Sequence, residues 1–471
     1  MRGLILSFAL ALALAPLAAG EPPIPFPPTL ISTAGELRSQ ALADGTALEL
    51  VTSLVNEVGA RPAGSEGDKK AVAWGLARFK GLGFDQVWSE EVTVPHWVRG
   101  TNSGEILAPN RHPLVLTALG GSVATPPGGL EAEVLRVESL ADLETRPNDS
   151  VAGKIVFIDE RMKATRDGSG YGAAVAKRGA GPGAAAKKGA AALLIRSAGT
   201  SKHRVAHTGA TRYPDGVVKI PAASLANVDA DVLAAQIATG QPVQVRLVLD
   251  TRVLPDEKSA NVIAELRGRE KPEEIVVLAC HLDSWDLGHG AQDDGAGCAT
   301  VMAAGRLLGR LPERPRRTVR VVLYANEEFG LSGARAYAQA HAAELPRHVA
   351  AAEADLGSGR VWRMHSGVTE DRLPAVRALA ELLAPLGIEL GPNDGSGGAD
   401  FIPLKTARVP LFALFQDATA YFEIHHTEND TLAFVDPESL AQNVAAHTIW
   451  AFAVAEWEGD WGRAPEGASG R

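Results

Sequence analysis

Several clusters of His, Asp and Glu in the second half of the chain end or follow an apolar run, and this pattern constrains the fold more than any other feature. Residues 275–280 form a continuous apolar run that leads directly into His281. Such runs are typical of strands that are buried on both faces of a sheet. In an open α/β sheet, ligands bind in the crevice beyond the carboxyl ends of the strands. The pattern therefore predicts an α/β fold with a polar site at one edge of its sheet.

The segment 251–458 alternates between strand and helix patterns. Strands are expected at 259–266, 275–281, 318–325, 348–355 and 409–415, and helices near 296–310, 331–344, 372–386 and 438–456. Helical spacing around 48–55 and over 68–82, followed by an alternating strand over 86–94, precedes them. We therefore expect a mixed sheet covered by helices on both faces, formed by the segments 21–119 and 251–458.

The sequence pattern of residues 120–250 differs from that of the flanking segments, and we expect this stretch to be an inserted domain. It holds four strand patterns, at 153–159, 191–195, 218–223 and 243–249, but no convincing cluster of metal ligands. His203 and His207 are four residues apart, which could place both on one face of a helix. Glycine, threonine and proline follow closely, so solvated loop histidines are the favoured interpretation.

The residue types at the expected sheet edge suit zinc. Imidazole and carboxylate are ordinary zinc ligands, and a site for two ions needs about five of them. The carboxylate of one acid in a Gly-rich turn could bridge two ions about 3.5–4 Å apart, although the alternative for that acid is a helix cap. The candidate ligands are His281, Asp293, one of the pair Glu327 and Glu328, Asp355, and one of the pair His425 and His426.

Neighbouring residues in these clusters have competing assignments. The side chains of Glu327 and Glu328 diverge, so that one can bind a metal ion while the other acts as general base. The alternative for this pair is a solvated turn before a helix N-terminus, where acids are favoured. Asp283 is expected to act in catalysis by accepting the second N–H of a ligating imidazole. His425 competes with His426, and spacing alone does not choose between them.

The order of these clusters resembles that of the co-catalytic di-zinc exopeptidases of the aminopeptidase Y type, and among them the carboxypeptidase Q (plasma glutamate carboxypeptidase) group. The resemblance covers nearly all of the chain after residue 20. The matching motifs are His281-Leu282-Asp283-Ser284-Trp285-Asp286, Asp293-Asp294-Gly295, Asn326-Glu327-Glu328, and His426-Thr427 with Asp430-Thr431.

The resemblance implies a zinc exopeptidase fold of the phosphorylase/hydrolase-like type, with a protease-associated domain over 120–250. It also implies that His281 and Asp355 bind one zinc ion, that Glu328 and His426 bind the other, and that Asp293 bridges them. Glu327 would be the general base, and the peptide bond after Asp293 would be cis. The implied activity is hydrolysis of dipeptides or short peptides, and the implied assembly is a homodimer.

Other functions remain open on the sequence alone. A broad-specificity aminopeptidase of the same fold would differ in its response to N-blocked and C-amidated peptides. A zinc-dependent cyclase that holds a single ion would need neither a bridging Asp293 nor two histidine ligands. A binding protein without catalytic activity would not need Glu327.

The net charge and the two ends of the chain indicate which partners and which cellular location to expect. The net charge of −10 argues against a nucleic-acid partner, because phosphate binding needs a basic footprint. Residues 1–20 have one positive charge, a short apolar stretch and small residues, which predicts a signal peptide and a secreted or periplasmic protein with no membrane span in its mature part. The tail 459–471 is expected to be flexible. The two cysteines, Cys280 and Cys298, are expected to be buried thiols beside the site.

Overall fold

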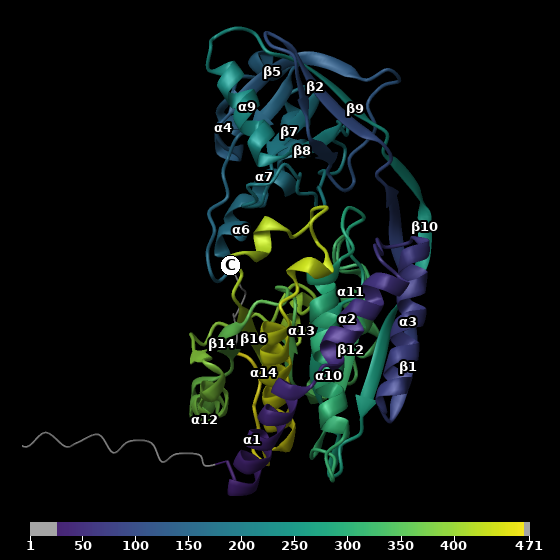
Figure 1. Cartoon of the computed structure of the whole chain (residues 1–471), viewed down its shortest axis with the longest axis vertical. Coiled ribbons are helices and arrows are strands. Elements are labelled where there is room, and N and C mark those ends of the chain that lie inside the picture. Colours follow the sequence, from purple (N-terminus) through teal and green to yellow (C-terminus); the bar gives the residue numbers. More distant parts are fainter. Residues whose placement is uncertain (1–25, 466–471) are drawn as a thin grey trace, which may run out of the picture.

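The computed structural model describes residues 26–465, which form two eight-stranded sheets, one above the other in Figure 1. The first sheet has the strand order β1-β10-β12-β11-β13-β16-β14-β15. Its central pairs, β11 with β12 and with β13, and β13 with β16, are parallel, whereas β1–β10, β10–β12 and β14–β16 are antiparallel. The strands are β1 (Gln86–Val98), β10 (Arg252–Leu266), β11 (Lys271–His281), β12 (Arg317–Tyr324), β13 (His348–Glu353), β14 (Val361–Gly367), β15 (Glu389–Leu390) and β16 (Leu411–Gln416).

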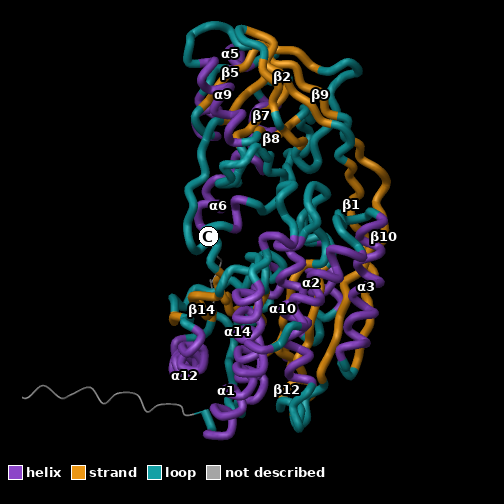
Figure 2. The backbone as a smooth tube through the Cα atoms, viewed as in Figure 1, coloured by secondary structure: helices purple, strands orange, loops and turns teal. Residues whose placement is uncertain are grey.

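Helices cover both faces of the first sheet (Figure 2). Alternate residues of β11 point to opposite faces, so that Val276 and Leu278 pack in the core below α10 and α14, while Val277 and Ala279 pack in the core below α11 and α13. This confirms the predicted mixed sheet between helices. The helices are α1 (Pro28–Ala43), α2 (Thr46–Glu57), α3 (Glu66–Leu82), α10 (Ala296–Gly309), α11 (Ser332–Ala340), α12 (Leu373–Leu383), α13 (Ile402–Thr406) and α14 (Pro437–Glu456).

The second sheet has the order β3-β2-β9-β5-β6-β7-β8-β4. The antiparallel ribbon β1–β10 leads into it and out of it, since β1 is followed by β2 and β9 is followed by β10. Its strands are β2 (Asn102–Ala108), β3 (His112–Leu114), β4 (Leu116–Ala118), β5 (Leu130–Val137), β6 (Ile155–Ile158), β7 (Ala192–Arg196), β8 (Ala222–Leu225) and β9 (Gln244–Leu249), and its helices are α4 (Leu140–Thr145), α5 (Asn148–Val151), α6 (Ser169–Ala174), α7 (Ala176–Gly179), α8 (Gly181–Lys187) and α9 (Asn227–Ile237).

The second sheet begins earlier than the predicted start of the inserted segment at residue 120. Strands β2, β3 and β4 all precede that position. They are short, and Pro109 and Pro113 interrupt their alternation, so no regular strand pattern marks them in the sequence. The pattern at 218–223 is also displaced, because the strand there is β8, Ala222–Leu225.

The two ends of the described chain differ from the sequence-based expectation. Helix α1, which no sequence pattern predicted, begins at Pro28, a position where proline is compatible with a helix start. The predicted signal peptide, residues 1–20, lies outside the described residues. The prediction of a flexible tail is wrong for residues 459–465, because Trp461 is fully buried against Phe412 and Trp457.

Among the helices within residues 26–465, none has the length and hydropathy needed to cross a bilayer. Cys280 and Cys298 are free, buried thiols, as expected.

Candidate metal centre

The five expected ligands converge beyond the carboxyl ends of the central strands. His281 is the last residue of β11, and Asp355 lies two residues after β13. Glu328 follows β12 by four residues, while Asp293 lies in the turn Ala291–Gly295 before α10, with an extended backbone conformation (φ −122°, ψ 93°). These ligands line one wall of a cavity of about 1170 Å³ whose other wall comes from the second sheet's helices and loops.

Asp293 stands at the centre of two groups of potential ligand atoms. Its Oδ1 lies 3.1 Å from His281 Nε2, which is itself 3.3 Å from Asp355 Oδ1. Its Oδ2 lies 3.1 Å from His426 Nε2, which is 2.9 Å from Glu328 Oε2. Each group of three offers its ligand atoms within 4.8 Å of one another. The two groups share one carboxylate, which is the arrangement that a bridging ligand requires.

The donor set fits zinc. Glu328 Oε1 is buried without a hydrogen-bond partner within residues 26–465. Asp293 Oδ2 is buried beside the two imidazole nitrogens of His425 and His426 without accepting a well-aligned hydrogen bond from either. Buried carboxylate oxygens without a partner are costly unless a cation or a proton occupies the space beside them. Imidazole nitrogen and carboxylate oxygen are ordinary zinc ligands, and the coordinating atoms point toward one another from separate elements.

The protonation of the site reflects crowding of acids and imidazoles. Burial favours the neutral imidazole of His281, but the adjacent carboxylates, Asp355 foremost, outweigh this effect and raise its pKa well above the usual value. Burial also raises the pKa of Glu327 well above its usual range, and raises that of Glu328 to about 7. Without a cation, burial and the crowding of charges thus favour the protonated forms of His281 and Glu327.

Backbone contacts fix the orientation of both central imidazoles. His281 Nδ1 lies 3.1 Å from the carbonyl oxygen of Asp283, and His426 Nδ1 lies 3.2 Å from the carbonyl oxygen of Thr208. When each Nδ1–H donates to its carbonyl, Nε2 is left free to act as a ligand.

The Asp283 carboxylate does not accept the second N–H of the His281 imidazole, although its spacing predicts that contact. Its nearer oxygen, Oδ1, is 3.6 Å from His281 Nδ1, beyond hydrogen-bond distance. Instead, Oδ1 accepts the backbone N–H of Glu327 at 2.9 Å and Oδ2 accepts that of Glu328 at 3.3 Å. Asp283 thus holds the main chain of the acid pair. Asn326, just before the pair, has a φ of 58°, a left-handed conformation that turns the chain there.

A second acid supports the turn that carries Asp293. The two carboxylate oxygens of Asp430 accept the backbone N–H of Gln292 at 2.6 Å and that of Asp293 at 3.2 Å. Asp294 accepts from the backbone N–H of His281 at 3.2 Å, which joins the turn to the end of β11. The peptide bond between Asp293 and Asp294 is cis, as the resemblance implied.

His207 corrects the sequence-based interpretation. It was expected to be a solvated loop histidine together with His203, and only His203 is exposed. His207 is buried, and its Nε2 lies 2.8 Å from His425 Nδ1. His425 Nε2 in turn lies 3.3 Å from Asp293 Oδ2. The burial of His207 depends on packing between the two sheets, and no local periodicity signals it.

Comparisons with known proteins agree with this geometry. The sequence profile of peptidase family M28 matches residues 261–451. Carboxypeptidase Q of Xenopus laevis is 36% identical over 90% of this chain and 88% of its own length, and human carboxypeptidase Q is 35% identical over 88% and 86%. The chain belongs to peptidase family M28. It is therefore a metallopeptidase, and its substrates are peptides.

Solved structures show the same architecture. The crystal structure of a peptidase M28 precursor from Shewanella amazonensis SB2B has a TM-score of 0.91 and 45% identity, covering 93% of this chain and 99% of that one. A zinc aminopeptidase from Bacillus subtilis has a TM-score of 0.64 and 21% identity, covering 88% and 95%, and shares the fold. The resemblance inferred from the motifs is thus confirmed at the level of family and fold, while the protease-associated character of residues 120–250 stays a prediction.

Proposed function

We propose that this protein is a di-zinc exopeptidase that hydrolyses dipeptides and short peptides. The observation that carries the proposal is the position of Asp293, whose two carboxylate oxygens each face a separate pair of ligand residues. His281 and Asp355 would hold one ion, and Glu328 and His426 the other. The similarity to carboxypeptidase Q over most of the chain supports an exopeptidase.

In the proposed reaction, the side chains position the substrate and move protons. Two bound zinc ions would supply positive charge that acidifies water and polarises the scissile carbonyl. Glu327 accepts the proton of the attacking water on its carboxylate and later delivers it to the leaving amine nitrogen. Its buried setting and raised pKa suit a group that must hold a proton between these two events. Asp283 acts through the main chain, by fixing the loop from which Glu327 projects.

Metal analysis tests the proposal. The purified protein, after reconstitution, should hold about two zinc ions per chain and cleave a free dipeptide. Asp293→Ala should lose more zinc than alanine at any other ligand position, because Asp293 alone faces both groups. A stoichiometry of one ion, or full zinc retention by Asp293→Ala, would refute the shared-carboxylate arrangement.

We further propose that the protein is exported and forms a homodimer. The N-terminal pattern at residues 1–20 supports export, and sequencing of the secreted protein should find its N-terminus near residue 21. The dimer rests on the resemblance alone, and sedimentation equilibrium at micromolar concentration measures it.

A further inference from the structure

The two walls of the cavity above the metal centre carry opposite charges. The acids of the proposed centre form the wall that belongs to the first sheet. The opposite wall carries the basic residues Arg178, Lys187, Lys188 and Arg212. Lys188 is turned toward the backbone, since its Nζ donates to the carbonyl oxygen of Arg146 at 2.7 Å. The two arginines remain as candidates for holding a negatively charged part of a substrate.

Arg178 is held in a defined position. Its Nη1 donates to the hydroxyl oxygen of Tyr171 at 2.5 Å and lies 3.3 Å from the carbonyl oxygen of Thr208. The guanidinium lies directly on Gly209, where an added Cβ would come within 2.2 Å of Nη1, so glycine is needed for this approach. The Nε atom is buried and has no partner among residues 26–465. A buried N–H without an acceptor indicates a place where a ligand oxygen can bind.

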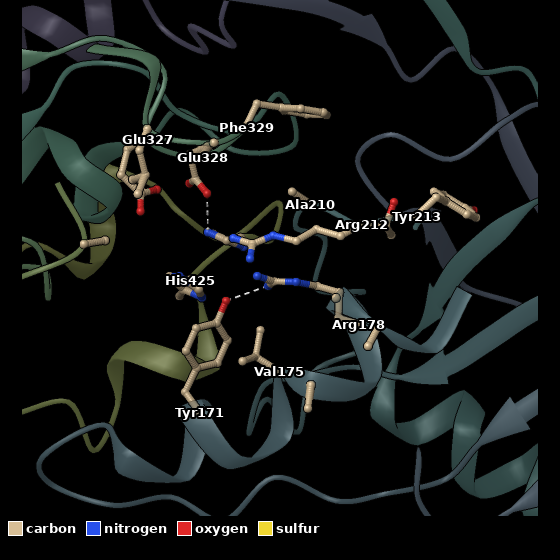
Figure 3. Close-up of a pocket in the computed structure, with 18 of the residues that line it drawn as sticks. Tyr171, Val175, Arg178, Ala210, Arg212, Tyr213, Glu327, Glu328, Phe329 and His425 are labelled. Carbon is tan, nitrogen blue, oxygen red and sulfur yellow. Dashed lines mark hydrogen bonds and ion pairs between the residues drawn. The ribbon is translucent and has the colours of Figure 1, made fainter. Parts of the chain in front are cut away.

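Arg212 approaches from the neighbouring loop. Its backbone N–H donates to the carbonyl oxygen of Gly179 at 2.9 Å, which ties the loop to the end of α7. Figure 3 shows the side chains of Arg212 and Arg178 extending in the same direction, toward Glu328 and His425. Across the described range 26–465, neither guanidinium has an ion pair with a carboxylate, although most other arginines do. Both guanidinium groups line the same cavity without a carboxylate partner among the described residues, so an anion that enters the cavity meets two positive charges there.

We infer that Arg178 and Arg212 are the residues that bind the free C-terminal carboxylate of the peptide substrate. The inference rests on the proposed function. In a dipeptide the carboxylate lies one residue, roughly 3.5 Å along the chain, beyond the scissile bond. Carboxylate recognition therefore has to come from the wall directly facing the metal centre, and this wall supplies the two guanidinium groups. Their planar forks match the two oxygens of a carboxylate.

The same cavity is poorly equipped to hold a free amine. Among its described lining residues, Glu144 is the one carboxylate besides the proposed metal ligands and Glu327, and Glu144 is exposed on α4. An aminopeptidase needs an acid or carbonyl oxygen near the metal ions to hold the substrate's ammonium group. The charges of the cavity thus favour a dipeptidase or carboxypeptidase over an aminopeptidase of the same fold.

The experiment compares three substrates that differ at their ends: a free dipeptide, its C-terminal amide and its N-acetyl derivative. The zinc-loaded wild type should cleave the amide about tenfold to a hundredfold less efficiently than the free dipeptide, the usual worth of a hydrogen-bonded charge. It should accept the N-acetyl derivative with little loss. The experiment measures kcat/KM for each substrate and the zinc content of the same samples.

Variants assign the effect to the arginines. Arg212→Gln and Arg178→Gln should each lower kcat/KM for the free dipeptide about tenfold or more, mainly through KM, and leave the value for the amide nearly unchanged. Arg178→Lys, which keeps the charge but lacks the fork, should restore part of the loss. Lys187→Gln is the control, because it removes a positive charge from the same wall. If the arginines bind the carboxylate directly, this variant should change the ratio of kcat/KM for the free dipeptide to kcat/KM for its amide by less than about twofold.

The outcomes separate the two proposals. A wild type that binds no zinc and cleaves none of the three substrates overturns the proposed function and the carboxylate site with it. A zinc-loaded wild type that cleaves the amide as well as the free dipeptide, or that rejects the N-acetyl derivative, overturns the carboxylate site alone. Equal losses for both substrates in Arg212→Gln, whose exposed side chain has no structural partner among the described residues, also overturn it.

Discussion

Replacing Asp283 by Asn tests whether one buried carboxylate holds the catalytic acid pair in place. Asp283 is 2% exposed and accepts two backbone N–H groups, one from Glu327 and one from Glu328. Asparagine retains one acceptor oxygen and places an NH₂ group at the other position. One backbone N–H would then face a donor in a buried setting, while the shape of the side chain hardly changes.

The cost can be estimated from that single lost acceptor. A buried donor left without a partner costs about 1–3 kcal/mol, which corresponds to roughly 5- to 150-fold in an equilibrium or rate constant. The loop can relieve the strain by shifting Glu327 and Glu328 away from the metal centre. We therefore expect kcat/KM for a dipeptide to fall by a factor in this range, and zinc affinity to fall about 10- to 100-fold, as is usual when a group that supports a ligand is changed.

Steady-state kinetics at saturating zinc, together with a zinc titration, measure both effects. Asp85→Asn is a control remote from the site, because the exposed Asp85 also accepts a backbone N–H, that of Arg267 at 2.8 Å, and pairs with Arg314 at the opposite end of the first sheet. The control should keep kcat/KM within about twofold of the wild type. Wild-type activity and zinc affinity in Asp283→Asn would refute the idea that its carboxylate positions the acid pair.

Two further predictions concern the acid pair and the core. Glu327→Gln should retain zinc and lose about 10²–10⁴-fold in kcat, whereas Glu328→Gln should lose zinc; the reverse pattern in kinetics and elemental analysis would exchange their roles. Burial lowers the pKa of His447 to about 4 from its ordinary 6.5, so between these values the unfolded chain binds a proton that the folded chain does not. The free energy of unfolding should therefore fall by about 3 kcal/mol as the pH drops from 6.5 to 4, and urea unfolding of His447→Gln should show a smaller loss, unless His447 is solvated and titrates normally.

The first sheet and its site were predictable because both follow from short stretches of sequence. The central strands of the first sheet, β11, β12 and β13, are largely buried on both faces and contain apolar runs, and expected ligands lie at or after the ends of these strands. His281 and Asp355 are examples in which the position of a residue in its strand was enough to place it in the cavity.

The features that the sequence did not reveal depend on contacts between distant segments. His207 is buried among residues that include His425, which contacts it from a position 218 residues away in the sequence. Trp461 lies in a polar, glycine-rich tail, yet it fills space beside Phe412. Arg178 belongs to a short helix, α7, with no motif around it, and it reaches the cavity only through the way the second sheet stands over the first. Local patterns carry no signal for such contacts.

The backbone contacts of Thr208 restrict which parts of this protein can be exchanged with those of a relative. Its N–H donates to the carbonyl oxygen of His426 at 2.9 Å, and its own carbonyl oxygen contacts His426 Nδ1. The segment 261–451, which matches the family profile, contains every expected ligand but not this clamp. A chimaera that transplanted the second sheet from a relative would therefore also replace the group that orients one ligating ring. An exchange of domains between such proteins preserves the metal centre only if the loop that carries Thr208 keeps its position beside His426.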